Sequence, residues 1–349
     1  MDSKVPKASP MFSLVMPVFN AEPFLEVCLD GILAQSYREW EAICIDDGST
    51  DGTAGILDDY ARKDNRIRVV HDVHEGVSVS RNKGIAMAVG SYIGFVDSDD
   101  MMEREWLSNV KELIAEWHPD LVRMNFHYLK NGCRNIHEPV ISNKEKVITR
   151  VEEICKWGWT TYPNGGWAWL NFIKREVLQQ SGVVFPREVS VKEDVVFLLK
   201  LIPFLRVVVQ SSRFGYTYRI REDSAWHLKR QSADCIKFLS SLLAIWRMQK
   251  VAIKNAGCEV VASKELGLAI WIDVLEWIDS RKCNRREGEE TIAGLLKDCV
   301  GDGILRVSTL PWRWRLGLHC LNRFNSFCLI VLVCRTRRWW VKLRRLRAA

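Results

Sequence analysis

The chain has 349 residues, of which 48% are hydrophobic and 27% charged, a composition typical of a soluble globular protein and not of a disordered one. This length allows one large domain or two modest ones.

The net charge of +7 is unevenly distributed: residues 303–349 contain eleven Arg or Lys and no Asp or Glu, whereas the remainder has 39 basic and 43 acidic residues. Residues 1–10 are polar and are not followed by the apolar h-region of a signal peptide, so we expect no secretory signal. Because the eleven cysteines include no C-x-x-C pair, we also expect reduced thiols and a cytoplasmic protein.

Four short apolar segments rich in β-branched residues are predicted strands, at residues 12–19, 42–45, 67–70 and 92–96. Helical periodicity between them predicts helices at residues 23–35, 53–63 and 78–89. Parallel strands joined through helices require crossover connections, which place helices on both faces of the sheet. The predicted fold class is therefore α/β, Rossmann-like, with a mostly parallel sheet.

Polar clusters follow three of these strands. Asn20 follows the first, Asp46 and Asp47 end the second, and residues 97–100 (DSDD) end the fourth. Ligands of open α/β sheets bind beyond the carboxyl ends of the strands. We therefore expect the ligand site at this edge of the sheet.

Asp97 and Asp99 are candidate metal ligands, because carboxylates on alternate residues can converge on one hard cation such as Mg²⁺ or Mn²⁺. Asp100, their neighbour, is a third candidate metal residue. The alternative is an acidic turn or N-cap before a helix over residues 101–114.

Two further polar elements can bind a nucleotide. Asp47 lies in a segment (DDGSTD) whose carboxylates can accept hydrogen bonds from a base or a ribose, and Arg81 can contact phosphate or base. The alternatives are a capped turn with Gly48 and Gly52 at its flexible positions and a solvated arginine.

The pattern is less regular from residue 151 to 218. A segment rich in Trp and Gly (157–169) precedes a predicted helix at 195–201, and we interpret this part as the acceptor half of the same domain, with Trp167 and Trp169 as candidate acceptor contacts. Glu193 and Asp194 stand just before the helix, where a charge pair favoured by the helix dipole is the alternative to catalysis. Residues 227–349 are predicted to form a C-terminal helical extension.

The motifs PVFN (17–20), IDDGSTD (45–51), GVSVSRNKG (76–84) and FVDSDD (95–100) occur in this order. Together they closely resemble the family 2 glycosyltransferases of GT-A fold. The resemblance continues through KEDVVF (192–197) and YRIREDS (218–224), and covers roughly residues 11–226.

The resemblance implies a GT-A domain over residues 1–226 that binds a nucleotide-sugar, and several roles carry over by position. Asp194, paired with Glu193, would be the catalytic base of an inverting transfer, which needs no protonated acid. Asp97 and Asp99 would hold ribose and metal, with the share of Asp100 open, and His227 could approach the diphosphate or metal. One departure is Asn171, which stands where relatives usually have Lys. The implied nucleotide-sugar contacts are Pro17, Asn20, Asp47, Arg81 and Asp97.

The tail combines an apolar block (327–334) with flanking Trp and Arg residues. Eight apolar residues are far fewer than the roughly 20 that span a bilayer as a helix, but basic amphipathic segments bind anionic membrane surfaces. We expect such a membrane contact and no nucleic-acid partner. The alternatives are nucleic-acid binding and packing on the chain's own domain or on a second copy in a homodimer.

The expected function is metal-dependent, inverting transfer of a sugar, from a UDP-sugar, to a glycan or lipid-linked acceptor in surface polysaccharide biosynthesis, at the inner face of the cell membrane. One alternative is a sugar-phosphate nucleotidyltransferase, which should carry a Gly-rich phosphate loop where this chain has PVFN. The other is a non-catalytic membrane-bound scaffold that retains the fold.

Overall fold

The computed structural model describes residues 10–130, 133–135, 144–150, 153–154, 167–188 and 193–221, together with residues 247, 248, 251 and 254. The chain divides into two compact units, Met1–Arg221 and Glu222–Ala349. The predicted helical extension, the basic tail, His227 and most of the segment 157–169 lie outside the described residues. Within the described part, no helix combines the length and the apolar character that a membrane crossing needs.

The predicted alternation of strands and helices is present in the first part of the chain. Parallel pairing joins β1 to β2 and β4, and β2 to β3. The elements are β1 (Phe12–Val18), α1 (Glu22–Leu33), β2 (Trp40–Asp46), α2 (Thr53–Lys63), β3 (Ile67–His71), α3 (Val77–Met87) and β4 (Tyr92–Phe95).

The second part supplies short strands that extend this sheet and build another. The helical elements are α4 (Trp106–Trp117), η1 (Ala168–Leu170), α6 (Arg175–Ser181), α7 (Glu193–Leu201) and η2 (Ile202–Phe204). The strands are β5 (Met101–Met102), β6 (Leu121–Arg123), β7 (Phe126–Lys130), β8 (Cys133–Asn135), β9 (Lys146–Ile148), β10 (Asn171–Lys174), β11 (Val208–Gln210) and β12 (Tyr216–Arg219).

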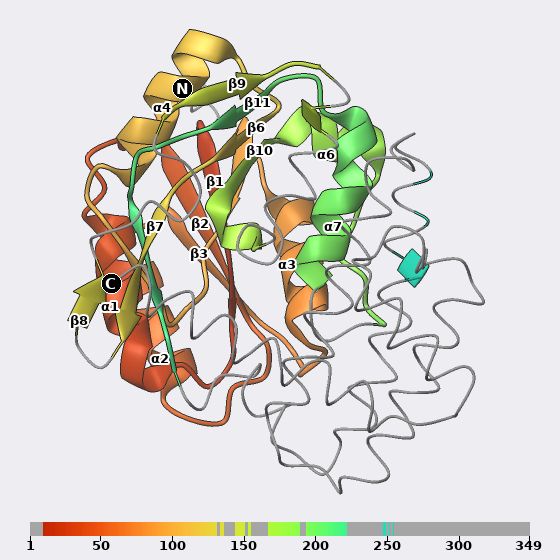
Figure 1. Cartoon of the computed structure of the whole chain (residues 1–349). Helices are drawn as coiled ribbons and strands as arrows, with labels where there is room; N and C mark the ends of the chain where they lie inside the picture. Colours follow the sequence, from red (N-terminus) through yellow and green to blue (C-terminus); the bar gives the residue numbers. More distant parts are fainter. Residues whose placement is uncertain are drawn as a thin grey trace, which may run out of the picture. The chain divides into compact units, whose positions relative to one another are not determined.

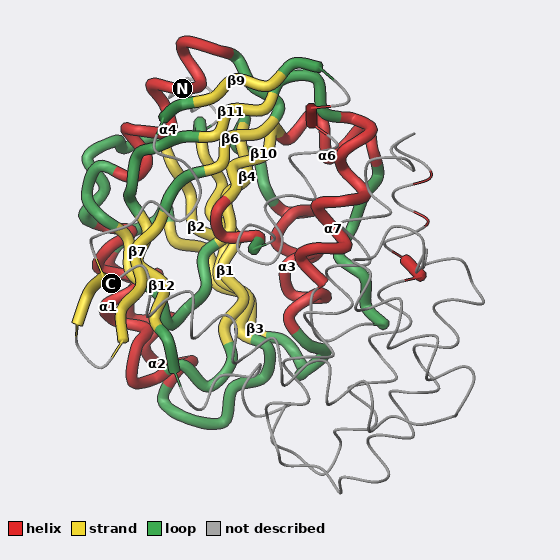
Figure 2. Tube along the Cα trace, viewed as in Figure 1, coloured by secondary structure: helices red, strands yellow, loops and turns green. Residues whose placement is uncertain are grey.

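The eight described strands of the larger sheet have the order β3-β2-β1-β4-β10-β6-β11-β9, and the smaller sheet has the order β5-β12-β7-β8 (Figure 2). Strand β10 runs antiparallel to both of its neighbours, and β9 is antiparallel to β11. The large sheet is thus parallel over β1 to β4 and mixed beyond.

The helix over residues 101–114, which the alternative interpretation of the acidic cluster assumed, begins later in the structure. Met101 and Met102 form β5 and pair with β12, and the N–H of Glu103 still donates to the carbonyl of Gly215 at 2.9 Å. These contacts keep the chain extended after the acidic cluster, so α4 begins only at Trp106.

Helices cover both faces of the large sheet, with α1 and α2 on one side and α3 and α7 on the other (Figure 1). Alternate residues of β1 (Phe12, Leu14, Met16, Val18) join the buried apolar residues of α1, α2 and α4 in one core, as the two-residue period of a strand requires. Val15 points to the other face, where α3 packs closely on β1 at Gly84.

Helix α7 is held on the second face by aromatic packing. Phe197 of α7 stacks on Phe185 with ring centroids 3.9 Å apart, and both rings pack edge-on against Phe95 at the end of β4. This packing brings the N-terminus of α7, with Glu193 and Asp194, close to the residues that follow β4.

Candidate active site

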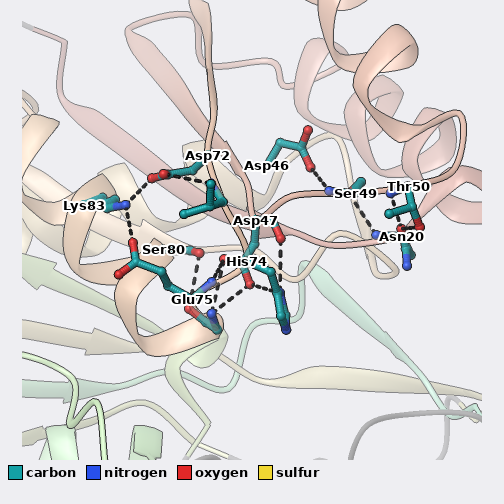
Figure 3. A network of polar contacts seen from close by, with 12 residues as sticks. Asn20, Asp46, Asp47, Ser49, Thr50, Asp72, His74, Glu75, Ser80 and Lys83 are labelled. Atoms are coloured by element: carbon teal, nitrogen blue, oxygen red, sulfur yellow. Dashed lines mark hydrogen bonds and ion pairs between the residues drawn. The ribbon is translucent and has the colours of Figure 1, made fainter.

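The loops after β1 and β2 are joined through Asn20 (Figure 3). Its amide oxygen accepts the N–H of Thr50 at 2.8 Å, and its own N–H donates to the hydroxyl of Ser49 at 3.0 Å. Asn20 has a φ of 47°, a conformation that Asn tolerates better than most residues. The loop that follows Pro17 is therefore fixed against the loop that contains Asp47.

Asp47 connects the end of β2 to the loop before α3, and its side chain is almost completely buried. One carboxylate oxygen accepts the N–H of Glu75 at 2.8 Å and the other accepts the N–H of Gly76 at 2.9 Å. Gly76 has a φ of 96°, which favours glycine. The Nδ1 atom of His74 lies 2.8 Å from the same oxygen that accepts from Gly76.

Arg81 lies buried in α3 between two carboxylates from distant parts of the chain. Its guanidinium donates to Asp97 at 3.0 Å and to Glu193 at 2.7 Å. Burial alone would lower the pKa of Arg81, but the negative charges of Asp97, Glu193 and Asp194 hold it above its ordinary value. Its Nε–H is buried and has no hydrogen-bond partner among the described residues.

Asp194 stands in the first turn of α7 and is only partly buried by neighbouring side chains. One of its oxygens accepts the N–H of Val195 at 2.8 Å. Burial and the negative charge of Glu193 raise the pKa of Asp194 to about 7, against the opposing effect of Arg81. A carboxylate with a pKa near neutrality is suited to general-base work.

Asp100 is fully buried and both of its oxygens are engaged. One accepts the hydroxyl of Tyr216 at 2.7 Å and the other accepts the N–H of Arg219 at 2.8 Å. Burial raises the pKa of Asp100 well above its ordinary value, and Asp99 adds to this effect. Asp100 thus connects the loop that follows β4 to β12 through two hydrogen bonds.

Asp97 and Asp99 are more open. Asp97 contacts Arg81 through one oxygen, and Asp99 contacts Arg221 at 3.0 Å through one oxygen, so within the described part of the chain one arginine contacts one oxygen of each carboxylate. Burial and the nearby charge of Asp97 raise the pKa of Asp99, so a cation at this point would relieve a repulsion between the two carboxylates. The described residues contain no group of three or more His, Cys, Asp or Glu placed to hold a metal. The two carboxylates nevertheless fit Mg²⁺ or Mn²⁺, which bind oxygen and commonly complete their shells with substrate phosphates and water.

The two candidate acceptor residues differ in exposure. Trp169 is only 2% exposed and stacks on Tyr216 and Tyr218, with ring centroids at 4.6 and 5.3 Å. Trp167 is partly exposed and stacks on Trp169 at 5.3 Å. Trp169 therefore supports Trp167 from the core, and Trp167 is the more exposed of the two rings.

Asn171, the departure from the usual pattern, is buried in β10. Its amide oxygen accepts the Nε–H of Arg123 at 2.8 Å, and burial lowers the pKa of Arg123 to about 9. The Asn is accommodated as a partner of a buried arginine, so its side chain is directed into the core.

Phe19 was missed by the sequence analysis. It is 45% exposed and its ring stacks on the His74 ring, with centroids 4.3 Å apart and an angle of 26° between the planes. The sequence feature that could have identified Phe19 is its position, as an aromatic residue immediately before Asn20 at the end of the apolar strand segment. Phe19, His74 and Asp47 thus lie together at the carboxyl end of β1 and β2.

Residues 13–176 match the family described as Glycosyl transferase family 2. This segment, slightly less than half of the chain, is similar to a family 2 glycosyltransferase domain. A curated relative, named as the uncharacterized glycosyltransferase EpsJ of Bacillus subtilis (strain 168), is 31% identical over 216 residues, which is 62% of this chain and 62% of EpsJ. The chain thus matches less than two thirds of that relative's length.

Two solved structures share the fold of this chain. S. aureus TarS in complex with UDP-GlcNAc has a TM-score of 0.70 at 21% identity, covering 94% of this chain and 91% of that chain. The mannosyltransferase PcManGT from Pyrobaculum calidifontis, in complex with GDP-Man and Mn²⁺, has a TM-score of 0.52 at 15% identity, covering 97% of this chain and 89% of that chain. At these identities the likeness shows the GT-A fold alone.

Proposed function

We propose that this protein is an inverting glycosyltransferase that uses a nucleoside-diphosphate sugar, a UDP-sugar in the first instance, as its donor. The observation that carries the proposal is the Arg81 bridge, in which one buried guanidinium contacts Asp97 at the end of β4 and Glu193 at the start of α7. This bridge places candidate donor-binding carboxylates beside Asp194, whose pKa is raised to about 7.

The nucleoside would bind beyond the ends of β1 and β2. Phe19 offers an exposed ring on which a base can stack, and Asp47 offers a buried carboxylate that can accept a ring N–H. Pro17 and Asn20 shape the adjoining loop, and Asp97 would reach the ribose. The complex of TarS with UDP-GlcNAc supports a uracil base, and that of PcManGT with GDP-Man makes guanine the alternative.

The metal would be held by Asp97 and Asp99, each of which contacts one arginine through a single oxygen. When bound, Mg²⁺ or Mn²⁺ supplies positive charge that stabilises the departing diphosphate, and the Mn²⁺ of PcManGT supports this choice. Asp100 would not take part, because both of its oxygens are already engaged by Tyr216 and Arg219. Its role would be to hold the loop in place.

The acceptor hydroxyl would lose its proton to Asp194, through the carboxylate oxygen that does not accept from Val195. Its oxygen then forms the new bond to the anomeric carbon as the bond to the diphosphate breaks on the opposite face, which inverts the configuration. Arg81 neutralises Glu193 and so limits how far the pKa of Asp194 rises. The exposed ring of Trp167 is the candidate contact for the acceptor.

The acceptor class and the cellular location extend the proposal further. We infer a glycan or lipid-linked acceptor, as in surface polysaccharide biosynthesis, reached at the inner face of the cell membrane through the basic tail. Support comes from the family resemblance and from the density of Arg and Trp after residue 312.

Donor binding is tested by titration calorimetry of UDP in the presence and absence of Mn²⁺. We expect Mn²⁺ to tighten binding and Asp99→Ala to weaken it about tenfold or more, as the loss of a charged contact worth about 1.5–3 kcal/mol requires. Asp59→Ala is the matched control, since Asp59 is an exposed residue of α2. Unchanged affinity and metal dependence in Asp99→Ala would remove Asp99 from the site.

A transfer assay separates the proposal from its rivals. A nucleotidyltransferase would release pyrophosphate from UTP and a sugar 1-phosphate, whereas a glycosyltransferase consumes UDP-sugar and releases UDP. A scaffold without turnover would do neither. Release of UDP that depends on an added glycan acceptor is the expected result.

A further inference from the structure

The imidazole of His74 fills the position that the proposed function gives to the nucleobase. Its ring stacks on Phe19, with centroids 4.3 Å apart. Its Nδ1 atom lies 2.8 Å from a carboxylate oxygen of Asp47 and 3.1 Å from the backbone carbonyl of the same residue. A planar heterocycle stacked on one aromatic ring, with a ring nitrogen 2.8 Å from a buried carboxylate oxygen, occupies the place expected of a bound uracil or guanine.

The imidazole and a nucleobase cannot both contact the carboxylate of Asp47, because a carboxylate has about four positions that accept hydrogen bonds. Asp47 already accepts from the backbone N–H groups of Glu75 and Gly76. The N–H of Gly76 contacts both oxygens, and the imidazole of His74 lies 2.8 Å from one of them, so the imidazole occupies the position that a base would use. A base that binds Asp47 must therefore take the place of His74.

We propose that His74 is a displaceable internal ligand of the donor's base site, and that the nucleobase binds by replacing the imidazole on both Phe19 and Asp47. This inference rests on the proposed function, which assigns the base to these two residues. Uracil, thymine and guanine carry a ring N–H that can substitute for that of the imidazole. Adenine and cytosine would direct a ring nitrogen lone pair at the carboxylate instead.

The loop backbone around His74 is held on both sides, so the exchange requires rotation of one side chain and not movement of the loop (Figure 3). Before His74, the N–H of Asp72 donates to the carbonyl of Asp46 at 2.9 Å. After it, Glu75 donates to Asp47, and Lys83 of α3 contacts both Asp72 and Glu75. The His74 side chain is itself 59% exposed, which leaves it room to turn toward solvent.

The consequence is an apparent donor affinity lower than the intrinsic one. When only a fraction of molecules has an open site, the measured Kd equals the intrinsic Kd divided by that fraction. Removing the imidazole should therefore tighten binding of any ligand that carries the base, and leave binding of the phosphates alone unchanged.

The test is calorimetric titration of the full chain with UDP, and separately with inorganic pyrophosphate, both with Mn²⁺. We expect His74→Ala to lower the Kd for UDP about three- to tenfold, the range that one exposed polar contact and one aromatic contact allow. The Kd for pyrophosphate should not change. Val73→Ala is the matched control, because Val73 is the adjacent residue and is 70% exposed.

Unchanged or weaker UDP binding in His74→Ala would overturn the inference while leaving the proposed function in place. An equal gain for pyrophosphate would also overturn it, since the effect would then not concern the base. Failure of the wild-type chain to bind UDP or GDP would remove the proposed function and the inference together. His74→Phe, which keeps the stacked ring but has no N–H, should give a Kd between those of wild type and His74→Ala.

Discussion

Arg81 illustrates how a buried charge is retained in this site. A guanidinium with no more than 5% of its side chain exposed would be strongly destabilising alone, and removal of one partner from such a buried pair typically costs about 3–5 kcal/mol. Here Asp97 and Glu193 each satisfy one terminal nitrogen. The arrangement pairs Glu193 with a counter-ion, and the pKa of the neighbouring Asp194 is raised to about 7.

Asp194→Asn should lower kcat about 10²–10⁴-fold, the usual contribution of a general base, with donor affinity nearly unchanged. Because the base acts as a carboxylate and the pKa of Asp194 is raised to about 7, the wild-type kcat/KM should fall as the pH drops below about 7 and level off above it. Steady-state kinetics across this pH range provide the measurement, with Asp59→Asn as an exposed control. Near-normal turnover by Asp194→Asn would exclude this role.

At the scale of elements, the sequence predicted β1 to β4 and α1 to α3 because long apolar and helical periods mark them. Strands β5 to β12 have two to five residues each. Strands β3 and β4 are as short, but they alternate with clear helical periods, whereas β5 to β12 lie in a less regular part of the sequence and could not be identified. The strand-end rule predicted that Asp47, Asp97 and Asp99 would follow strands. It could not predict that Asp100 bonds to Tyr216, or that His74 contacts Asp47, because these contacts depend on tertiary packing.

Helix α3 carries Arg81 and approaches β1 so closely that only glycine fits at residue 84. A Cβ atom there would lie 2.3 Å from Cγ1 of Val15, a residue within a buried strand. Gly84→Ala should therefore lower the free energy of unfolding by about 1–3 kcal/mol through overpacking, as measured by urea denaturation.

Gly55→Ala provides the matched control in helix α2, where an added Cβ meets nothing within 4 Å. It should raise the free energy of unfolding by about 0.5–1 kcal/mol, since alanine is the better helix former. Equal effects of the two substitutions would contradict the close packing of α3 on β1.

At the scale of the whole molecule, the first unit contains the proposed chemistry and the second ends in the basic tail. Each Lys or Arg near an anionic surface contributes about 1 kcal/mol, and residues 335–347 contain seven of them. Several such charges together with Trp side chains should hold the protein at the membrane peripherally, with a partly salt-sensitive affinity because the ionic share is screened.

Co-sedimentation with liposomes tests this proposal on the full chain. We expect the wild type to pellet with anionic vesicles and less with neutral ones, and a variant with the seven basic residues of 335–347 replaced by Gln to lose most of this preference. Equal pelleting of both proteins, or no preference for anionic lipid, would assign the tail to packing or to nucleic acid.

The Arg81 bridge also limits how this chain can change over evolution. Loss of Asp97 or Glu193 would leave the guanidinium with excess charge, and loss of Arg81 would leave two neighbouring carboxylates without a counter-ion. A single neutral replacement at any of these positions is therefore more harmful than a coordinated one, so the effects of substitutions should be strongly epistatic. The Arg81 side chain thereby links variation in donor binding to variation in catalysis. Libraries that randomise Arg81, Asp97 or Glu193 one at a time would therefore contain few active variants.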